Sequence, residues 1–215
     1  MALAEKRTLR HGELGEHQGL NGLAVFKNNR KDMVIDVENP KVDWYFKLSP
    51  NGRVPAIVDP NNNDLVLWES GAILEYLVDT YDKENKLNVT DFADKWHLKQ
   101  YLHFQMSGQG PYFGQFVWFS VYHQESFPSA KARYEKEIVR VVGVLNDILK
   151  GKEYLVGGKV TYADIAFIPW NRILNNDKLL NFVEKYELKE KYPDFYAWNE
   201  RLLSRPAVKK VLGIE

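Results

Sequence analysis

The chain has 215 residues, of which 45% are hydrophobic and 13% aromatic, enough to fill one large core or two small ones. Its 29 basic and 29 acidic residues balance, so no net field favours a nucleic acid or an anionic membrane surface. The chain contains no cysteine, which excludes a disulfide framework and any thiol nucleophile supplied by the protein itself.

The first forty-eight residues show only short elements. Glycines interrupt the first twenty residues, so we expect an irregular segment there that ends in the turn dipeptide Asn21-Gly22. Met33–Val37 is short and β-branched, which predicts a buried strand. The stretch 40–48 has apolar residues at roughly helical spacing, which predicts a short helix or a tight turn.

The next stretch predicts a hairpin. Asn51-Gly52 is a strong turn dipeptide, and Ala56–Val58 is a short apolar strand that ends at an Asp-Pro pair. The polar run 61–64 is the expected hairpin loop, and the chain returns through the apolar residues Leu65–Trp68.

A Val54-Pro55 pair opens the first of these strands. Proline cannot donate to a sheet ladder, so it suits an edge, and an X-Pro bond is where a cis peptide is least costly. A cis bond would turn the N–H and C=O of Val54 outward, free to pair with an extended peptide by strand addition. The alternative is that Pro55 merely begins an edge strand.

Glu69 and Ser70 stand directly before a helical pattern with apolar residues at 73, 74 and 77. At a helix start, the hydroxyl of Ser70 and the free N–H groups of the first turn suit a carboxylate, and the carboxylate of Glu69 suits an ammonium group. A ligand with both charges at one end and a peptide-like middle satisfies both features. The alternative is that Ser70 only caps its own helix.

These motifs carry a resemblance. Asn51–Ile57 (NGRVPAI) and Trp68–Leu77 (WESGAILEYL) resemble the glutathione-binding half of cytosolic glutathione transferases. The likeness is strongest to the fungal group related to the yeast nitrogen-catabolite regulator that forms a prion, and to the bacterial nu class. It implies that Arg53, Val54 and Pro55 line the glutathione backbone, with Val54 pairing to the cysteinyl unit. It further implies that Glu69 and Ser70 hold the γ-glutamyl group.

The resemblance also implies a role for Asn21, whose side-chain amide would lie near the glutathione sulfur and favour the thiolate. A plain Asn-Gly turn is the alternative. This segment departs from the family pattern, because Leu20 replaces a proline and the first helix is short by about two turns. We therefore expect an α+β thioredoxin-like domain over residues 1–81, with a mixed sheet and a reduced first helix.

The second half of the chain predicts helices alone. A charged stretch without periodicity gives a linker at 82–90, and helical patterns dominate the domain expected at 91–215. Pro128 opens a helix that Gly151 closes. Thr161 and Asp164 form a capping-box-like start for the next helix, which assigns them to structure rather than chemistry.

The stretch 105–119 contains three glycines and a proline, which predict a break in the helix. Its Gly-x-Gly does not indicate a nucleotide site, because no strand precedes it. The resemblance implies that its aromatic residues line a pocket for an apolar second substrate, the alternative being that about half of them belong to the core. The candidates are Tyr112, Phe113, Phe116, Trp118 and Phe119.

Other chemistries find no support in the sequence. The five histidines show no metal-ligand spacing, and the P-loop and serine-hydrolase motifs are absent. No apolar run approaches the roughly 18 residues of a membrane span, and the first ten residues lack a signal-peptide core, so we expect a cytoplasmic location.

The family resemblance therefore implies a glutathione transferase that forms a homodimer. Glutathione would attack a small apolar or aromatic electrophile or a mixed disulfide, with no covalent enzyme intermediate, metal or nucleotide. The alternative is a non-catalytic binder of aromatic small molecules that keeps the same fold.

Overall fold

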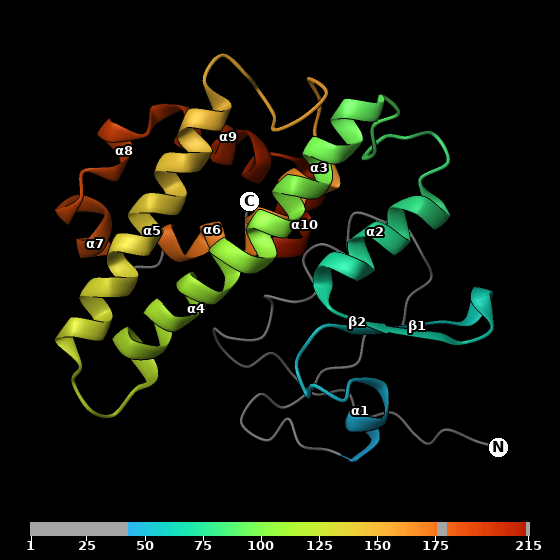
Figure 1. Ribbon diagram of the computed structural model, residues 1–215, viewed down its shortest axis with the longest axis horizontal. Coiled ribbons are helices and arrows are strands. Elements are labelled where there is room, and N and C mark those ends of the chain that lie inside the picture. Colours follow the sequence, from blue (N-terminus) through green and yellow to red (C-terminus); the bar gives the residue numbers. More distant parts are fainter. Residues whose placement is uncertain (1–42, 176–179, 214–215) are drawn as a thin grey trace.

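The computed structural model describes residues 43–175 and 180–213 (Figure 1). In chain order the helices and strands are α1 (Asp43–Leu48), β1 (Ala56–Asp59), β2 (Leu65–Trp68), α2 (Ser70–Tyr81), α3 (Phe92–Phe104), α4 (Gly110–Val117), α5 (Pro128–Leu149), α6 (Tyr162–Asn171), α7 (Leu180–Lys185), α8 (Leu188–Lys191), α9 (Pro193–Leu203) and α10 (Pro206–Leu212). The predicted strand Met33–Val37 and the segment around Asn21 lie outside the described residues.

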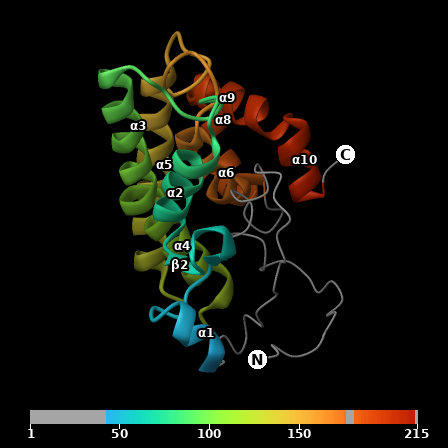
Figure 2. The same ribbon diagram turned by 90° about the vertical axis from the view of Figure 1, so that its right-hand side faces the viewer.

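The predicted hairpin is confirmed. Strands β1 and β2 pair antiparallel, with Ala56 opposite Trp68 and Asp59 opposite Leu65. A single 3₁₀ turn over Pro60–Asn62 connects them, followed by Asn63 in the left-handed conformation. Helix α1 lies next to this hairpin, and α2 packs against both strands on one side and α6 on the other (Figures 1 and 2). Helix α2 therefore links the thioredoxin-like part to the helical part.

Asp59 fastens the turn of the hairpin to α2. Its buried carboxylate accepts hydrogen bonds from the Tyr76 hydroxyl at 2.5 Å, from the Tyr81 hydroxyl and from the Asn62 amide at 3.0 Å. The two tyrosine donors, Tyr76 first, hold the pKa of Asp59 well below its usual range. Burial, together with the Asp59 carboxylate, raises the pKa of Tyr76 to about 12, so that hydroxyl remains a donor.

The segment between α2 and α3 contains no helix or strand. It nevertheless packs on the helical part, because Leu87 and Val89 are buried in the main core. The carbonyl of Leu87 also accepts a hydrogen bond from the N–H of Tyr162, at the start of α6. These contacts fix the segment where it reaches the second domain.

Helices α3 and α4 form one continuous rod, so the predicted helix break is wrong (Figure 1). A π-helical turn over Gln105–Gln109 joins them, and the residues at the junction keep helical backbone angles. The wider turn precedes Pro111, where an α-helix would lose a backbone hydrogen bond. Two of the glycines serve packing instead, because a Cβ at Gly110 or Gly114 would lie 3.1–3.2 Å from the ring of Trp170.

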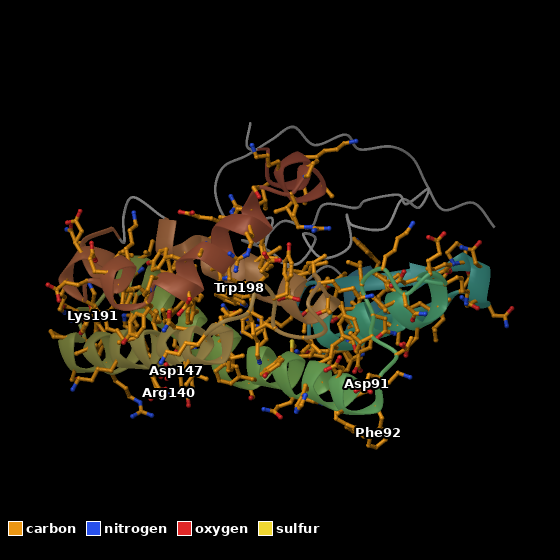
Figure 3. All side chains as sticks on the ribbon, turned by 90° about the horizontal axis from the view of Figure 1, so that it is seen from above. Asp91, Phe92, Arg140, Asp147, Lys191 and Trp198 are labelled. Carbon is orange, nitrogen blue, oxygen red and sulfur yellow. The ribbon has the colours of Figure 1, made fainter. Side chains whose placement is uncertain are left out.

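The core of the helical part lies between α5, α6 and α9. The helix predicted between Pro128 and Gly151 is α5, and one face of it is apolar: Ile138, Val141, Leu145 and their neighbours along this face are fully buried. Figure 3 shows Trp198 of α9 at the centre, whereas Arg140, Asp147 and Lys191 lie at the periphery. Helix α6 is buried on nearly all sides because α2, α3 and α9 surround it.

Asp164 anchors the start of α6, as the capping-box pattern predicts. Its Oδ2 accepts hydrogen bonds from the N–H and the hydroxyl of Thr161, both at 2.8 Å. The other oxygen accepts from the N–H of Leu155 at 3.0 Å and from the indole N–H of Trp198 at 2.9 Å. One buried carboxylate thus connects the loop before α6, the helix start and the core of α9.

Candidate functional site

The register of the hairpin brings the two predicted groups of binding residues together. Ala56 pairs with Trp68 at the open end of the hairpin. Val54 lies two residues before Ala56 and Ser70 two residues after Trp68, so both leave the same end of the sheet. Directly opposed residues of an antiparallel pair are only about 5 Å apart at their Cα atoms. The sequence motifs at 53–55 and 69–70 therefore lie at the same end of the hairpin.

The first group of predicted binding residues, 53–55, is an exposed stretch of backbone that neighbouring residues hold in place. The Val54–Pro55 peptide bond is cis, Pro55 is buried, and Val54 is 54% exposed. The carbonyl of Arg53 accepts hydrogen bonds from the Tyr45 hydroxyl at 2.7 Å and from the Ser49 hydroxyl at 3.2 Å. Burial raises the pKa of Tyr45, which keeps its hydroxyl protonated as the donor. Helix α1 thereby holds the backbone before Val54 in place, while the Arg53 side chain is exposed.

The second group of predicted binding residues, Glu69 and Ser70, lies at the start of α2. Glu69 occupies the N-cap position and Ser70 is the first helical residue. Glu69 makes no side-chain capping hydrogen bond to the first turn. Ser70 stands one position inside the helix, and its hydroxyl donates to Met106. A helix start of this kind presents N–H groups and a hydroxyl suited to a carboxylate.

Glu69 has an unusual backbone conformation. Its φ is 73° with ψ at 114°, a region that non-glycine residues rarely adopt. Such conformations cost free energy and concentrate at ligand sites, where the surrounding structure maintains them. The Glu69 side chain is exposed beside Ser70. A carboxylate and a hydroxyl on consecutive residues can hold the ammonium and the carboxylate of one α-amino acid group.

Met106 is a residue of this site that the sequence did not indicate. The Ser70 hydroxyl donates a hydrogen bond to its Sδ over 3.6 Å, across 36 positions of the chain. Met106 belongs to the π-helical turn between α3 and α4. It therefore brings the helical domain into contact with the start of α2. No local pattern marks such a residue, because only the tertiary fold brings it to Ser70.

The π-helical turn that carries Met106 is held by buried amides. Gln105 donates to Gln109 at 3.2 Å, Gln109 donates to Asn171 at 2.7 Å, and Asn171 donates to Asn199 at 3.0 Å. All four side chains are buried. A chain of satisfied buried amides fixes the register of the turn against α6 and α9. Gln105 and Gln109 stand four residues apart in an otherwise apolar stretch, and this spacing is the sequence signal that could have indicated the buried amides.

The five predicted pocket aromatics divide into two sets. Phe113 and Phe116 are fully buried in the core, so for these two the alternative holds that they are core residues and do not line a pocket. Trp118 is 49% exposed, and Tyr112 and Phe119 are partly exposed. These three retain ring surface for a ligand.

A stacked aromatic group surrounds Phe119. Its ring stacks on Tyr134 at 5.7 Å between centroids and on His123 at 5.4 Å. The ring of Tyr112 lies 6.5 Å from that of Tyr134, and the guanidinium of Arg140 lies over the Tyr112 ring at 5.8 Å. These contacts hold the rings in place, and Tyr112 and Phe119 keep part of their surface exposed.

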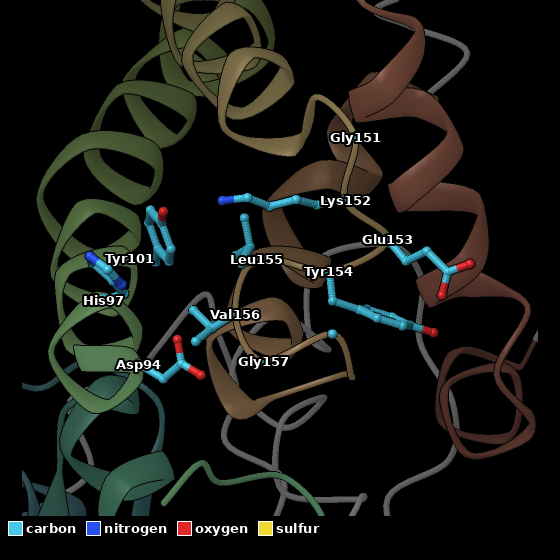
Figure 4. A pocket seen from close by; sticks show the side chains of 11 residues that line it. Asp94, His97, Tyr101, Gly151, Lys152, Glu153, Tyr154, Leu155, Val156 and Gly157 are labelled. Carbon is cyan, nitrogen blue, oxygen red and sulfur yellow. The ribbon is translucent and has the colours of Figure 1, made fainter. Parts of the chain in front are cut away.

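A separate cavity of about 500 Å³ lies elsewhere on the helical part (Figure 4). Asp94, His97 and Tyr101 of α3 line one side, and the loop 151–158 lines the other. Along α3, Asp94 is twelve residues from Met106, which corresponds to about 18 Å of helix. Its lining mixes charges of both signs, and it is not part of the site at α2.

Within the described ranges, no group of three or more His, Asp or Glu side chains is placed to hold a metal ion. Among the helices that the structure describes, none is long and apolar enough to cross a bilayer. Asn21, the predicted partner of the sulfur, lies outside the described residues.

The fold and site define a class: a thioredoxin-like domain with a cis-proline loop, followed by an all-helical domain. The family model "Glutathione S-transferase, N-terminal domain" matches residues 28–80, and "Glutathione S-transferase, C-terminal domain" matches residues 111–206. Glutathione S-transferase 2 of Schizosaccharomyces pombe is 49% identical over 176 residues, which cover 79% of this chain and 76% of that protein. The chain therefore belongs to the glutathione S-transferase family.

The predicted likeness to the fungal group is also confirmed. The transcriptional regulator URE2 of Saccharomyces cerevisiae is 32% identical over 203 residues, covering 78% of this chain and 55% of the regulator. The glutathione transferase URE2P6 of Phanerochaete chrysosporium, solved with oxidized glutathione, has a TM-score of 0.83 at 42% identity and covers 91% of this chain and 89% of its own. Ure2p5 of the same fungus, crystallized with 1-(S-glutathionyl)-2,4-dinitrobenzene, has a TM-score of 0.75 at 38% identity, with 95% of both chains covered.

Proposed function

We propose that this chain binds glutathione at the open end of the hairpin and uses the glutathione thiol against a second, apolar molecule. Val54 pairs with the cysteinyl backbone, Ser70 and the first turn of α2 bind the γ-glutamyl carboxylate, and Glu69 binds the ammonium group. The supporting observation is the start of α2, where Glu69 makes no side-chain capping bond and the hydroxyl of Ser70 donates only a weak hydrogen bond, to the Met106 thioether. Glutathione carries both charges on one α-carbon, which matches this pair.

The second substrate in this proposal is an aromatic electrophile or a glutathionyl mixed disulfide. One similar fungal structure was solved with a dinitrobenzene conjugate of glutathione, which corresponds to an aromatic electrophile. Another was solved with oxidized glutathione, which is a glutathionyl disulfide. Tyr112 lies six residues from Met106, about 9 Å along the helical rod, and supplies the exposed ring surface closest in sequence to this site. Trp118 and Phe119 lie about twice as far along the rod and extend this aromatic surface away from the site. Because the chain has no cysteine, the only thiol in the reaction is that of glutathione, and rate arises from positioning and thiolate stabilisation.

The test of the site is the affinity for glutathione, measured by calorimetry on the wild type and Ser70→Ala. Losing one hydrogen bond to a charged group costs about 1.5–3 kcal/mol, which weakens binding about tenfold to a hundredfold. Ser129→Ala is the matched control, because Ser129 is an exposed serine at the start of α5. Equal affinities of the two variants, with unchanged helix content, would reject the role of Ser70.

A second candidate function is the non-catalytic binding of aromatic molecules. It is favoured by the stacked group around Phe119, which presents ring surface whether or not the thiolate is activated. Turnover of 1-chloro-2,4-dinitrobenzene with glutathione discriminates the two functions. The transferase proposal predicts steady formation of the conjugate, whereas binding of the aromatic compound without turnover would favour the second function.

The quaternary structure is part of the proposal. We expect a homodimer, as the family resemblance implies. Phe92 and Trp96 form an edge-to-face pair on the outer side of α3 and are 76% and 60% exposed, an apolar surface that a second copy would cover. Size-exclusion chromatography with light scattering gives the mass directly.

A further inference from the structure

The redox chemistry of sulfur in this chain is confined to methionine. The sequence has no cysteine and three methionines, at positions 1, 33 and 106. Met106 is the one that falls within the described ranges. Among the residues that the structure describes, Met106 is therefore the candidate for sulfur oxidation at this site.

Met106 lies against the first turn of α2. Besides the 3.6 Å hydrogen bond from Ser70, its side chain covers Gly71: a Cβ at that glycine would be 3.2 Å from Cγ and 3.3 Å from Sδ. The buried amides of Gln105 and Gln109 hold the turn behind it. The Met106 side chain is nevertheless partly exposed, so a small oxidant can reach its sulfur.

The thioether is well suited to share a hydroxyl with a ligand. A thioether sulfur is a weak acceptor, so Ser70 gives up little when its hydroxyl turns to a carboxylate. A hydrogen bond to an ionised acceptor is roughly twice as strong as one between neutral groups. The sulfur therefore orients the hydroxyl in the free protein and releases it when the ligand arrives.

We propose that Met106 is an oxidation site that controls ligand binding at Ser70, an inference that rests on the proposed glutathione function. Hydrogen peroxide transfers one oxygen to the Met106 sulfur: the sulfur loses two electrons and gains an S–O bond, the O–O bond breaks, and the second oxygen leaves as water. The product is methionine sulfoxide, which methionine sulfoxide reductases convert back.

Oxidation changes the weak acceptor into a strong one. The sulfoxide oxygen carries partial negative charge and accepts the Ser70 hydroxyl in competition with the γ-glutamyl carboxylate. It also places this charge at the positive end of α2, where the carboxylate would bind. Oxidation therefore weakens glutathione binding.

The test compares glutathione affinity before and after treatment with hydrogen peroxide, with peptide mass spectrometry to quantify the sulfoxide at Met106. The wild type is expected to bind about five- to tenfold more weakly after oxidation, the equivalent of one competing hydrogen bond, and methionine sulfoxide reductase should restore it. Met106→Leu keeps a similar side-chain volume and should show the same affinity before and after peroxide. In Ser70→Ala, oxidation should change the affinity less than about twofold, because the competing hydroxyl is gone.

Three outcomes overturn this proposal alone: full sulfoxide formation with unchanged affinity, no oxidation at Met106, or equal peroxide sensitivity in Met106→Leu. An effect of the same size in Ser70→Ala would also overturn it, since the hydroxyl would not be involved. Failure of the untreated wild type to bind glutathione would instead overturn the proposed function, and this inference with it.

Discussion

Asp164→Asn is the substitution whose effect on stability follows most directly from the structure. The carboxylate accepts four hydrogen bonds, two on each oxygen, and all four partners are donors. An asparagine has one acceptor oxygen, so it can retain two of these bonds. Its NH₂ group would face the other two donors. The change keeps the shape of the side chain and alters only its hydrogen bonding.

Each buried donor left without an acceptor costs about 1–3 kcal/mol, so two of them predict a loss of about 2–6 kcal/mol. A natural domain has a free energy of unfolding of about 5–15 kcal/mol, so the variant loses a large part of its stability. Burial raises the pKa of Asp164 and the four donors lower it. The donors nevertheless fit the ionised form, since it offers acceptors on both oxygens.

Urea unfolding followed by circular dichroism measures the difference, and Asp147→Asn is the control. Asp147 pairs with Lys150 at 2.7 Å on the surface of α5, and its side chain is 69% exposed. Exposed pairs contribute about 0–1 kcal/mol, so this variant should unfold close to the wild type. If Asp164→Asn unfolded within about 0.5 kcal/mol of Asp147→Asn, the structural role assigned to Asp164 would be refuted.

Two further predictions concern a titration and the chemistry at sulfur. The pKa of Asp59 is lowered by Tyr76 and Tyr81, so its stabilising contribution is present above the unfolded value of about 3.9 and is lost as the pH falls toward the lowered native value. Urea midpoints between pH 7 and pH 3 should therefore fall more steeply for the wild type than for Asp59→Asn; parallel profiles would contradict this. Asn21→Ala should lower kcat about a hundredfold, because the amide of Asn21 would then no longer donate a hydrogen bond to the thiolate of glutathione. The affinity for glutathione should stay nearly unchanged. Single-turnover kinetics with 1-chloro-2,4-dinitrobenzene measures the change in rate, and an unchanged kcat would remove Asn21 from the mechanism.

Much of the fold was predictable because its signals are local. Turn dipeptides on either side of short apolar runs indicate the hairpin. The spacing of apolar residues along α5 corresponds to its buried face. The Thr161–Asp164 spacing gives the start of α6. Each of these depends on residues within a few positions of one another.

The helix break at 105–119 was predicted wrongly for a physical reason. Glycine and proline weaken an isolated helix, but here a π-helical turn accommodates Pro111, and Gly110 and Gly114 make room for Trp170. Trp170 is more than fifty residues away in the sequence, so the local pattern does not contain the reason for the glycines. The long-range contact between Met106 and Ser70 was inaccessible for the same reason.

The candidate site was predictable as a pattern, and its chemistry is still a prediction. Val54, Glu69 and Ser70 carry the motif, and the hairpin register shows that they come together. The structure adds that Ser70 is the first residue of α2 with its hydroxyl donating to Met106, and that Glu69 holds a strained conformation. The roles of these residues toward glutathione are the claims that experiments must now test.

The most direct test of the central claim combines a change in the protein with a change in the ligand. Calorimetry measures the affinity of the wild type and Glu69→Gln for glutathione and for its analogue without the amino group. A hydrogen-bonded charge pair is worth about 1.5–3 kcal/mol, so the wild type should prefer glutathione by at least about tenfold, and Glu69→Gln should lose most of that preference. A wild type that does not bind glutathione, or a preference that persists in Glu69→Gln, would contradict the proposed site.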